Sequence, residues 1–404
     1  MSDVIAKKTI AVSALSLTSR RSPSSHVIRS VLRPATTRCP CTAVIALCRR
    51  ALPSSSTRVA HDRRSRSAWT LGTAPSSVAL ETPTMEGKSA PAATDHWLEV
   101  NGVATRVLCC GRSVAADGDK PIDRLLVFVC GNPGVTVFYE RFLEELHKAT
   151  GIPAWVVSHA GHEMPPANSE LRVPDQKAHP ELYTLQGQVE HKLRFVEKYV
   201  PDKCELYLAG HSIGTKIISE MLKDETMTTR VNIKQALFFF PTLKKMRDTP
   251  NGHNLITMTS YLLSTTLFLS WIFTTFPNFI KKSLVKMTLM IMEGRSVDDY
   301  LVRSGLVLVH PTVLRNVFAM ALDEMDKVYE LDSKVLNDNA SKLHMYFGNC
   351  DGWVPVPFYD EIHKQVPEAE AVLCDKGYQH AFVLRYSDEI AAIATDWINK
   401  DLKK

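Results

Sequence analysis

The chain has 404 residues, 45% of them hydrophobic, so it can bury a large core, and its length alone allows two or three domains of about 150 residues. Its formal net charge of +5 is unevenly distributed, because residues 1–80 contain thirteen Lys and Arg against two acidic residues. The basic surplus therefore belongs to the N-terminal segment. In that segment, aromatic residues do not alternate with the basic ones, and no nucleic-acid-binding module is recognisable. Both observations argue against nucleic-acid binding.

The N-terminal segment, residues 1–85, is rich in Ser, Thr, Arg and Pro and shows no sustained hydrophobic period. Such a composition buries too little apolar surface to fold, so we expect a disordered basic extension. Two alternatives stay open: an Arg-rich, acid-poor transit peptide, and a natural start at Met85. A secretory signal does not fit, because Ser, Thr and Lys interrupt the apolar run.

From residue 95 onward the chain alternates predicted strands and helices, which is typical of an α/β protein with a mostly parallel sheet flanked by helices. The core is predicted in two parts, residues 95–242 and 343–404, on either side of an insertion. The expected strands are a hairpin at 96–100 and 105–110, followed by 125–130, 154–158, 205–209, 236–240, 343–347 and 371–374.

Residues 243–342 form the insertion, which is mostly helical in pattern. Within it, residues 249–280 contain no charged side chain and have lysines on both sides. A run of about 20 such residues can cross a bilayer, but a span would place one α/β domain on two sides of a membrane. We therefore expect a lid over an acyl pocket, with its outer face in a lipid interface. A spanning helix and an ordinary buried hairpin are the alternatives.

A sharp turn between a strand and a helix is predicted at residues 210–214, which read Gly-His-Ser-Ile-Gly. This is the pattern of a nucleophile elbow, in which small residues make room for a strained turn that exposes the serine. Ile217 and Met221 continue a helical stripe after the turn. Ser212 is therefore the predicted nucleophile of an α/β-hydrolase fold, and a structural serine in a Gly-rich turn is the alternative.

A serine nucleophile needs a histidine base, which in turn needs a carboxylate, and in α/β hydrolases both follow the serine along the chain. Asp351 follows the strand at 343–347, and His380 follows the strand at 371–374. Both are expected at the sheet edge where Ser212 emerges. The alternative roles are turn formation by Asp351 and a surface position for His380. Residues on predicted helices, on a strand or in the insertion fit less well: Asp323, Asp326, Asp332, Asp360, His310, His344 and His363.

Two backbone N–H groups are predicted to form an oxyanion hole, those of Ile213 and Asn132. Asn132 belongs to a Gly- and Pro-rich loop after the strand at 125–130, and the alternative is a turn without a catalytic role. Residues 159–162, His-Ala-Gly-His, lack a carboxylate or cysteine at ligand spacing, so we expect them to shape the pocket floor. The nine cysteines lack paired metal spacing, so we predict reduced thiols of an intracellular protein, with no metal and no cofactor.

Six motifs follow one another along the chain: Gly-Asn-Pro-Gly at 131–134, Ser-His-Ala-Gly-His at 158–162, Gly-Gln-Val-Glu-His-Lys-Leu at 187–193, the elbow at 210–214, Asp-x-Trp-x-Pro at 351–355 and His-Ala-Phe at 380–382. In this order they resemble the lipid droplet-associated hydrolases over roughly residues 96–404. The resemblance implies a serine lipid hydrolase on lipid droplets and the endoplasmic reticulum. It further implies action on sterol esters or related neutral lipids, with Ser212, Asp351 and His380 as the triad. Residues 1–85 have no counterpart in the family.

Ester hydrolysis through an acyl-enzyme is the leading hypothesis for function. A serine at the elbow argues against an epoxide hydrolase or a dehalogenase, which would use an acidic nucleophile there. Two alternatives remain: a weakly catalytic or non-catalytic droplet protein that binds lipid through residues 249–280, and a transferase that passes the acyl group to a sterol or glycerol.

Overall fold

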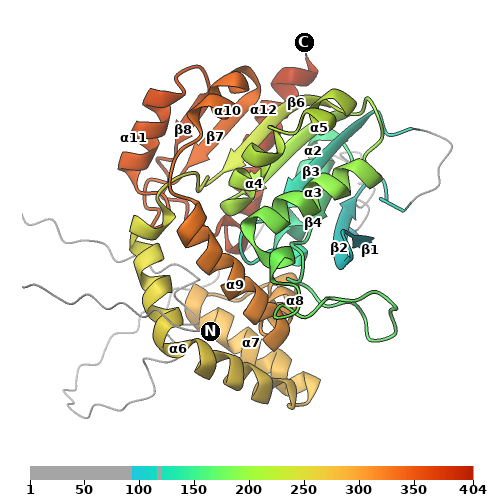
Figure 1. Cartoon of the computed structure of the whole chain (residues 1–404), viewed down its shortest axis with the longest axis vertical. Helices are drawn as coiled ribbons and strands as arrows, with labels where there is room; N and C mark the ends of the chain where they lie inside the picture. Colours follow the sequence, from blue (N-terminus) through green and yellow to red (C-terminus); the bar gives the residue numbers. More distant parts are fainter. Residues whose placement is uncertain (1–92, 116–120, 404) are drawn as a thin grey trace, which may run out of the picture. The chain divides into compact units, whose positions relative to one another are not determined.

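An eight-stranded sheet organises residues 93–115 and 121–403, the part of the chain that the computed structural model describes (Figure 1). The extension predicted at 1–85 lies outside the described residues. The order across the sheet is β1-β2-β4-β3-β5-β6-β7-β8. The strands are β1 (Thr94–Val100), β2 (Val103–Cys110), β3 (Arg124–Val129), β4 (Ala154–Val157), β5 (Glu205–His211), β6 (Asn232–Phe239), β7 (Leu343–Phe347) and β8 (Glu370–Leu373).

The sheet is parallel from β4 to β8 in spatial order, and the antiparallel pairs are β1–β2 and β2–β4. The prediction of a mostly parallel α/β sheet is thereby confirmed. The β1–β2 hairpin turns at Asn101 and Gly102, whose φ angles of 50° and 74° suit a tight Asn-Gly turn. β6 begins four residues before the predicted start, at Asn232, because polar and half-exposed residues at its first positions conceal the strand pattern.

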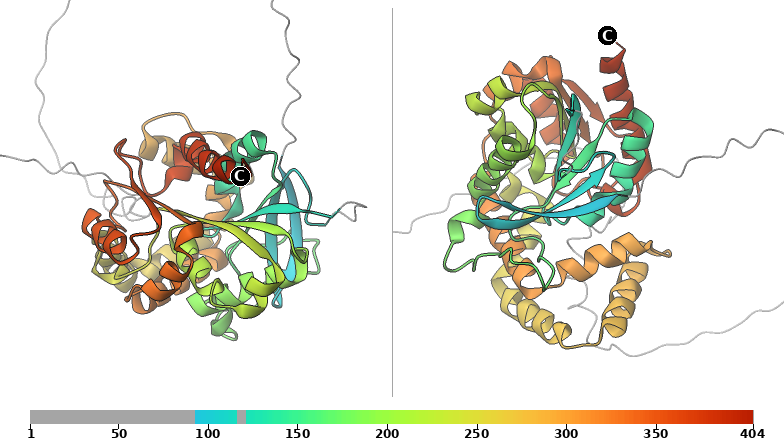
Figure 2. Two further views of the ribbon diagram at one scale, coloured as in Figure 1. Left: turned by 90° about the horizontal axis from the view of Figure 1, so that it is seen from above. Right: turned by 90° about the vertical axis from the view of Figure 1, so that its right-hand side faces the viewer.

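Helices cover both faces of the sheet (Figure 2). Buried side chains of α2 (Glu140–Thr150) and α12 (Ser387–Leu402) form one core cluster, and those of α3 (Leu185–Tyr199) and α4 (Ile213–Met221) contribute to another. Alternate residues of the strands join one cluster or the other, as the two-residue strand period requires. Smaller helices are α5 (Glu225–Arg230), α10 (Ser333–Asp338) and α11 (Val356–Gln365).

The longer helices between β6 and β7 are α6 (Pro250–Thr274), α7 (Asn278–Glu293), α8 (Asp299–Leu308) and α9 (Pro311–Lys327). They gather at one end of the sheet (Figure 1; Figure 2, right). The chain leaves and re-enters the core at one place, because the Lys245 N–H donates to the Tyr329 carbonyl and the Met246 N–H to the Val328 carbonyl, each at 3.0 Å. Thr249 caps α6 by accepting a hydrogen bond from the Gly252 N–H.

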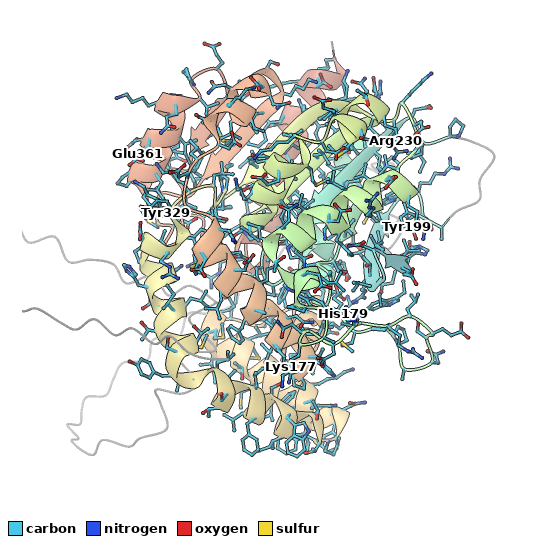
Figure 3. All side chains as sticks on the ribbon, viewed as in Figure 1. Lys177, His179, Tyr199, Arg230, Tyr329 and Glu361 are labelled. Carbon is cyan, nitrogen blue, oxygen red and sulfur yellow. The ribbon has the colours of Figure 1, made fainter. Side chains whose placement is uncertain are left out.

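The outer face of α6 carries large apolar side chains that nothing in the described chain covers (Figure 3). Tyr261 is 80% exposed, and Phe268 and Trp271 are each 58% exposed. This exposure rules out the ordinary buried hairpin. By length and composition, α6 could cross a membrane, and so could α8 and α9 if they were one span, although these two meet at 80°.

Candidate active site

The elbow places Ser212 in a backbone conformation that side chains rarely adopt. Its φ is 53° and its ψ −124°, between the end of β5 and the start of α4. Close contacts leave no room for a side chain at either flanking glycine. A Cβ on Gly214 would lie 2.3 Å from the Val129 carbonyl oxygen, and one on Gly210 would lie 2.8 Å from the Ile218 side chain. Gly210 and Gly214 thus allow the turn to pack against β3 and its own helix.

Ser212, His380 and Asp351 form one hydrogen-bonded array. His380 Nε2 is 2.8 Å from Ser212 Oγ, and His380 Nδ1 is 2.6 Å from Asp351 Oδ2. The other carboxylate oxygen, Asp351 Oδ1, accepts the N–H groups of Trp353 and Val354. Each of the three residues is less than 10% exposed. The structure therefore brings together the three side chains that the sequence predicts as a triad.

A second chain of hydrogen bonds runs through His211, the residue before the serine. The Gly131 N–H donates to Tyr139 Oη at 2.8 Å, and the Tyr139 hydroxyl donates to His211 Nδ1 at 2.8 Å. His211 Nε2–H then donates to the His380 carbonyl, also at 2.8 Å. Burial, with His380 nearby, lowers the pKa of His211 well below its usual value, so the ring is neutral and its tautomer is fixed by this chain.

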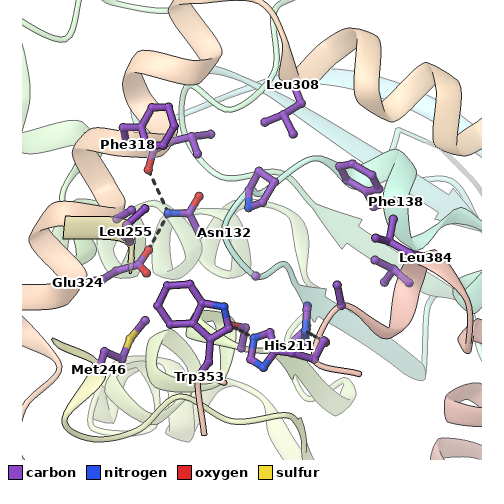
Figure 4. Close-up of a pocket in the computed structure, with 18 of the residues that line it drawn as sticks. Asn132, Phe138, His211, Met246, Leu255, Leu308, Phe318, Glu324, Trp353 and Leu384 are labelled. Atoms are coloured by element: carbon purple, nitrogen blue, oxygen red, sulfur yellow. Dashed lines mark hydrogen bonds between the residues drawn. The ribbon is translucent and has the colours of Figure 1, made fainter. Parts of the chain in front are cut away.

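The loop after β3 lies directly against the elbow. A Cβ on Gly131 would be 3.1 Å from Ser212 Cβ. No described residue accepts a hydrogen bond from the backbone N–H of Asn132 or of Ile213. The Asn132 side chain, in contrast, is held by α9, since its Nδ2 donates to the Val317 carbonyl at 3.1 Å and to Glu324 Oε1 at 2.9 Å (Figure 4).

A cavity of about 170 Å³ opens beside Ser212 and His380, and most of its wall is apolar. The sheet side contributes Phe138 and Trp353, and the insertion contributes most of the opposite wall (Figure 4). The lining residues from the insertion are Met246 in the turn before α6, Leu255 and Met258 of α6, Leu308 of α8, and Leu314, Val317, Phe318, Ala321 and Glu324 of α9.

Comparison with known proteins identifies the family. The sequence model of a family described as lipid-droplet associated hydrolase matches residues 123–383. The chain belongs to this family. The lipid droplet-associated hydrolase of Drosophila melanogaster is 34% identical over 76% of this chain and 98% of the relative. The Gallus gallus and Homo sapiens relatives of that name are 36% and 31% identical, each over 77% of this chain and 96% of the relative.

Solved structures support the fold assignment. A bacterial membrane phospholipase A superposes with a TM-score of 0.53 at 13% identity, over 78% of this chain and 88% of that one. The thioesterase domain from the curacin biosynthetic pathway superposes with a TM-score of 0.51 at 12% identity, over 75% of this chain and 99% of the domain. At these identities the likeness shows the α/β-hydrolase fold alone.

Residues 159–162 do not line the cavity, in contrast to the expected role at its floor. His162 Nδ1 instead accepts the Gly134 N–H at 2.9 Å, and the His159 ring lies where a side chain on Gly134 would be. Burial lowers the pKa of His162 to about 3, which keeps the ring neutral and able to accept this bond. Within 93–115 and 121–403, no three or more His, Cys, Asp or Glu residues are grouped as a metal site would need.

Glu324 is a site residue that the sequence interpretation missed. It is 3% exposed, and burial raises the pKa of its carboxyl group to about 8. A signal was available in the pattern of α9, because Leu314, Val317 and Ala321 form a stripe at helical spacing and Glu324 is the next position of that stripe. An acid in a core stripe is costly to bury and therefore informative.

Replacing Tyr139 by Phe removes the hydroxyl that joins the Gly131 N–H to His211 Nδ1. We expect the free energy of unfolding to fall by about 2 kcal/mol, because two buried polar groups lose their partner. Ester turnover should fall about tenfold or more as the loop and the elbow lose their common support. Denaturant unfolding and initial rates measure the two effects.

The matched control is Tyr199→Phe, which removes a hydroxyl that bonds the Glu99 carbonyl on an exposed part of α3 (Figure 3). This variant should retain both stability and turnover. If Tyr139→Phe behaved in the same way, the hydrogen-bond chain would not support the site.

Glu324→Gln tests the neutral carboxyl through pH-dependent stability. The folded protein holds the Glu324 proton up to a pKa of about 8, whereas the ordinary pKa of a glutamate carboxyl is 4.5. Between these values the unfolded chain binds fewer protons, so this group's contribution is full below pH 4.5 and is lost as pH rises to 8, at up to about 1.4 kcal/mol per pH unit. Relative to the unchanged protein, Glu324→Gln should therefore gain stability from pH 5 to 8 in denaturant titrations. If the free energies of unfolding of the two proteins changed with pH in the same way, Glu324 would not be a buried neutral acid.

Proposed function

We propose that the chain is a serine hydrolase of neutral lipid esters, sterol esters or related lipids, acting at the lipid droplet surface. The observation that carries this proposal is the array of Ser212 Oγ, His380 Nε2 and Asp351 Oδ2, at 2.8 and 2.6 Å, beside an apolar cavity. The relatives named lipid droplet-associated hydrolase support the choice of a lipid substrate.

The proposed reaction has two halves. Ser212 Oγ attacks the ester carbonyl carbon while His380 Nε2 takes the hydroxyl proton, and Asp351 stabilises the imidazolium that forms. His380 then gives this proton to the leaving alcohol. A water molecule, deprotonated by His380, attacks the acyl-enzyme, and the fatty acid leaves as Ser212 regains its proton.

The developing oxyanion would be held by the backbone N–H groups of Ile213 and Asn132. Three observations support this assignment. Ile213 follows the nucleophile, Gly131 packs directly on Ser212, and neither N–H is engaged by a described acceptor. The side-chain bonds from Asn132 to α9 would hold the second donor in place.

The insertion would act as both lid and lipid contact. Leu255 and Met258 near the start of α6 line the cavity, while the outer side chains of the same helix face away from it. Exposed Lys282 and Lys286 follow on α7 and suit the head-group region of a lipid droplet or of the endoplasmic reticulum. We therefore propose that residues 249–280 rest on this surface without crossing it.

The first test is labelling with a fluorophosphonate, which reacts with activated serines, alongside turnover of cholesteryl oleate and a short-chain ester. The unchanged protein should label and hydrolyse ester. Ser212→Ala should not label, and its turnover should fall by about a thousandfold or more. Ser341→Ala, at the amino end of β7 and on the surface, is the control and should match the unchanged protein.

Labelling without turnover would indicate an activated serine that serves an acyl acceptor other than water. If neither label nor product formed with the unchanged protein, the hydrolase proposal would fail. A droplet protein that binds lipid through its exposed α6 face would then be the better account.

The lipid contact is tested by a double substitution on α6, Phe268→Ser with Trp271→Ser, whose rings stack on each other at 6.1 Å between centroids. Binding to phospholipid-coated triolein droplets, measured by flotation, should weaken by about tenfold or more, because apolar area that would enter lipid is lost. Tyr329→Ser, which removes an aromatic ring that is 54% exposed beyond the end of α9, should float as before (Figure 3). Equal flotation of all three proteins would refute the contact.

A further inference from the structure

Glu324 is the one carboxyl group among the described residues that line the cavity. It projects from α9 beside Asn132, among side chains that are mostly apolar (Figure 4). Ser212 and His380, which line the same cavity, already have roles in the proposed reaction. Glu324 helps to hold Asn132, a task that does not need an ionisable group, so an acid in this apolar wall requires a further explanation.

The Glu324 carboxyl group has unused hydrogen-bonding capacity. Asn132 Nδ2 donates to Oε1, and no described residue bonds to Oε2. The amide oxygen of Asn132 is also enclosed without a described partner. With a pKa raised to about 8 by burial, the carboxyl is protonated at neutral pH and can donate a hydrogen bond as well as accept one.

Holding α9 against the loop does not explain an acid at this position. The Val317 carbonyl already accepts a hydrogen bond from Asn132 Nδ2, and it carries no ionisable group. An apolar residue at 324 would extend the stripe of Leu314 and Ala321 without the desolvation cost of a carboxyl. The acid is better explained by a polar group on the bound substrate.

The place of Glu324 limits where that polar group lies. Glu324 bonds the side chain of Asn132, the next residue after Gly131, which packs on Ser212. The backbone N–H of Asn132 is the proposed donor to the ester oxyanion. A substrate group that reaches Glu324 is therefore only a few bonds from the ester that is cleaved. In neutral lipids, a polar group so close to an ester is a hydroxyl on the alcohol part or a neighbouring ester, and the hydroxyl is the smaller of the two and can donate as well as accept.

We propose that Glu324 is a specificity-determining residue that hydrogen-bonds a free hydroxyl on the alcohol part of the substrate. The site then prefers acylglycerols that retain a free hydroxyl over esters of plain alcohols and sterols. This inference rests on the proposed ester hydrolysis and narrows its substrate class. A hydroxyl can accept the carboxyl proton, whereas an apolar alcohol leaves the buried O–H of Glu324 without an acceptor.

The test compares two esters of the same acid, 1-oleoylglycerol and propyl oleate, which differ by the two hydroxyls of the three-carbon alcohol. The unchanged protein should favour 1-oleoylglycerol by about tenfold in kcat/KM, the size of one hydrogen bond. Glu324→Leu should bring the ratio of the two kcat/KM values close to one. Glu324→Gln, which keeps a neutral donor, should preserve most of the preference. The control Glu330→Leu changes an exposed glutamate beyond α9 and should keep the original ratio.

A second measurement needs no variant. The dimethyl ether of 1-oleoylglycerol keeps the oxygen atoms as acceptors but lacks donors, so it cannot donate to a carboxyl oxygen of Glu324 and should lose part of the preference. Equal kcat/KM values for 1-oleoylglycerol and propyl oleate, or an unchanged ratio in a folded Glu324→Leu protein, would overturn the inference while ester hydrolysis stands. If the unchanged protein cleaved none of the three esters and did not label at Ser212, the proposed function would fail, and this inference with it.

Discussion

The strained turn at Ser212 is the constraint on which the rest of the site depends. A positive φ at a serine is unfavourable, so surrounding contacts must hold it. Gly214 lets the start of α4 pack against the backbone of β3, and the parallel pairing of β5 with β3 and β6 fixes the strand that leads into the turn. The serine hydroxyl is therefore positioned by the middle of the sheet.

His211 connects this turn to the other parts of the site. Its two ring nitrogens reach Tyr139 on one side and the His380 carbonyl on the other, so one neutral ring joins the loop after β3 to the loop after β8. A charged ring would oppose the imidazolium that the proposed reaction forms at His380. Burial prevents that charge, which makes the same desolvation useful for both geometry and electrostatics.

Sequence patterns were enough to predict the features that depend on a short segment of the chain. The strand periods, the elbow at 210–214 and the loops that carry Asp351 and His380 each depend on a short segment, and the topology of a parallel sheet brings their ends together. The stripe of α9 marks Glu324 as a buried acid, but the partners of Tyr139 and Glu324 could not be assigned in this way, since they lie 72 and 192 residues away. The charge-free run 249–280 likewise indicated an apolar segment, but only packing decides which of its side chains face the cavity and which face outward.

Two helices of the insertion, α6 and α9, connect the outer apolar face to the proposed reaction centre. α6 presents Phe268 and Trp271 outward and Leu255 to the cavity, and it packs against α9, which holds Asn132. A lipid that enters from a surface beneath α6 would therefore meet an apolar wall first and Glu324 beside the oxyanion loop. In such an arrangement the apolar wall would select for lipid in general, while the proposed role of one buried carboxyl would be to distinguish among lipid esters, because an unpaired polar group is penalised more heavily than a missing methylene.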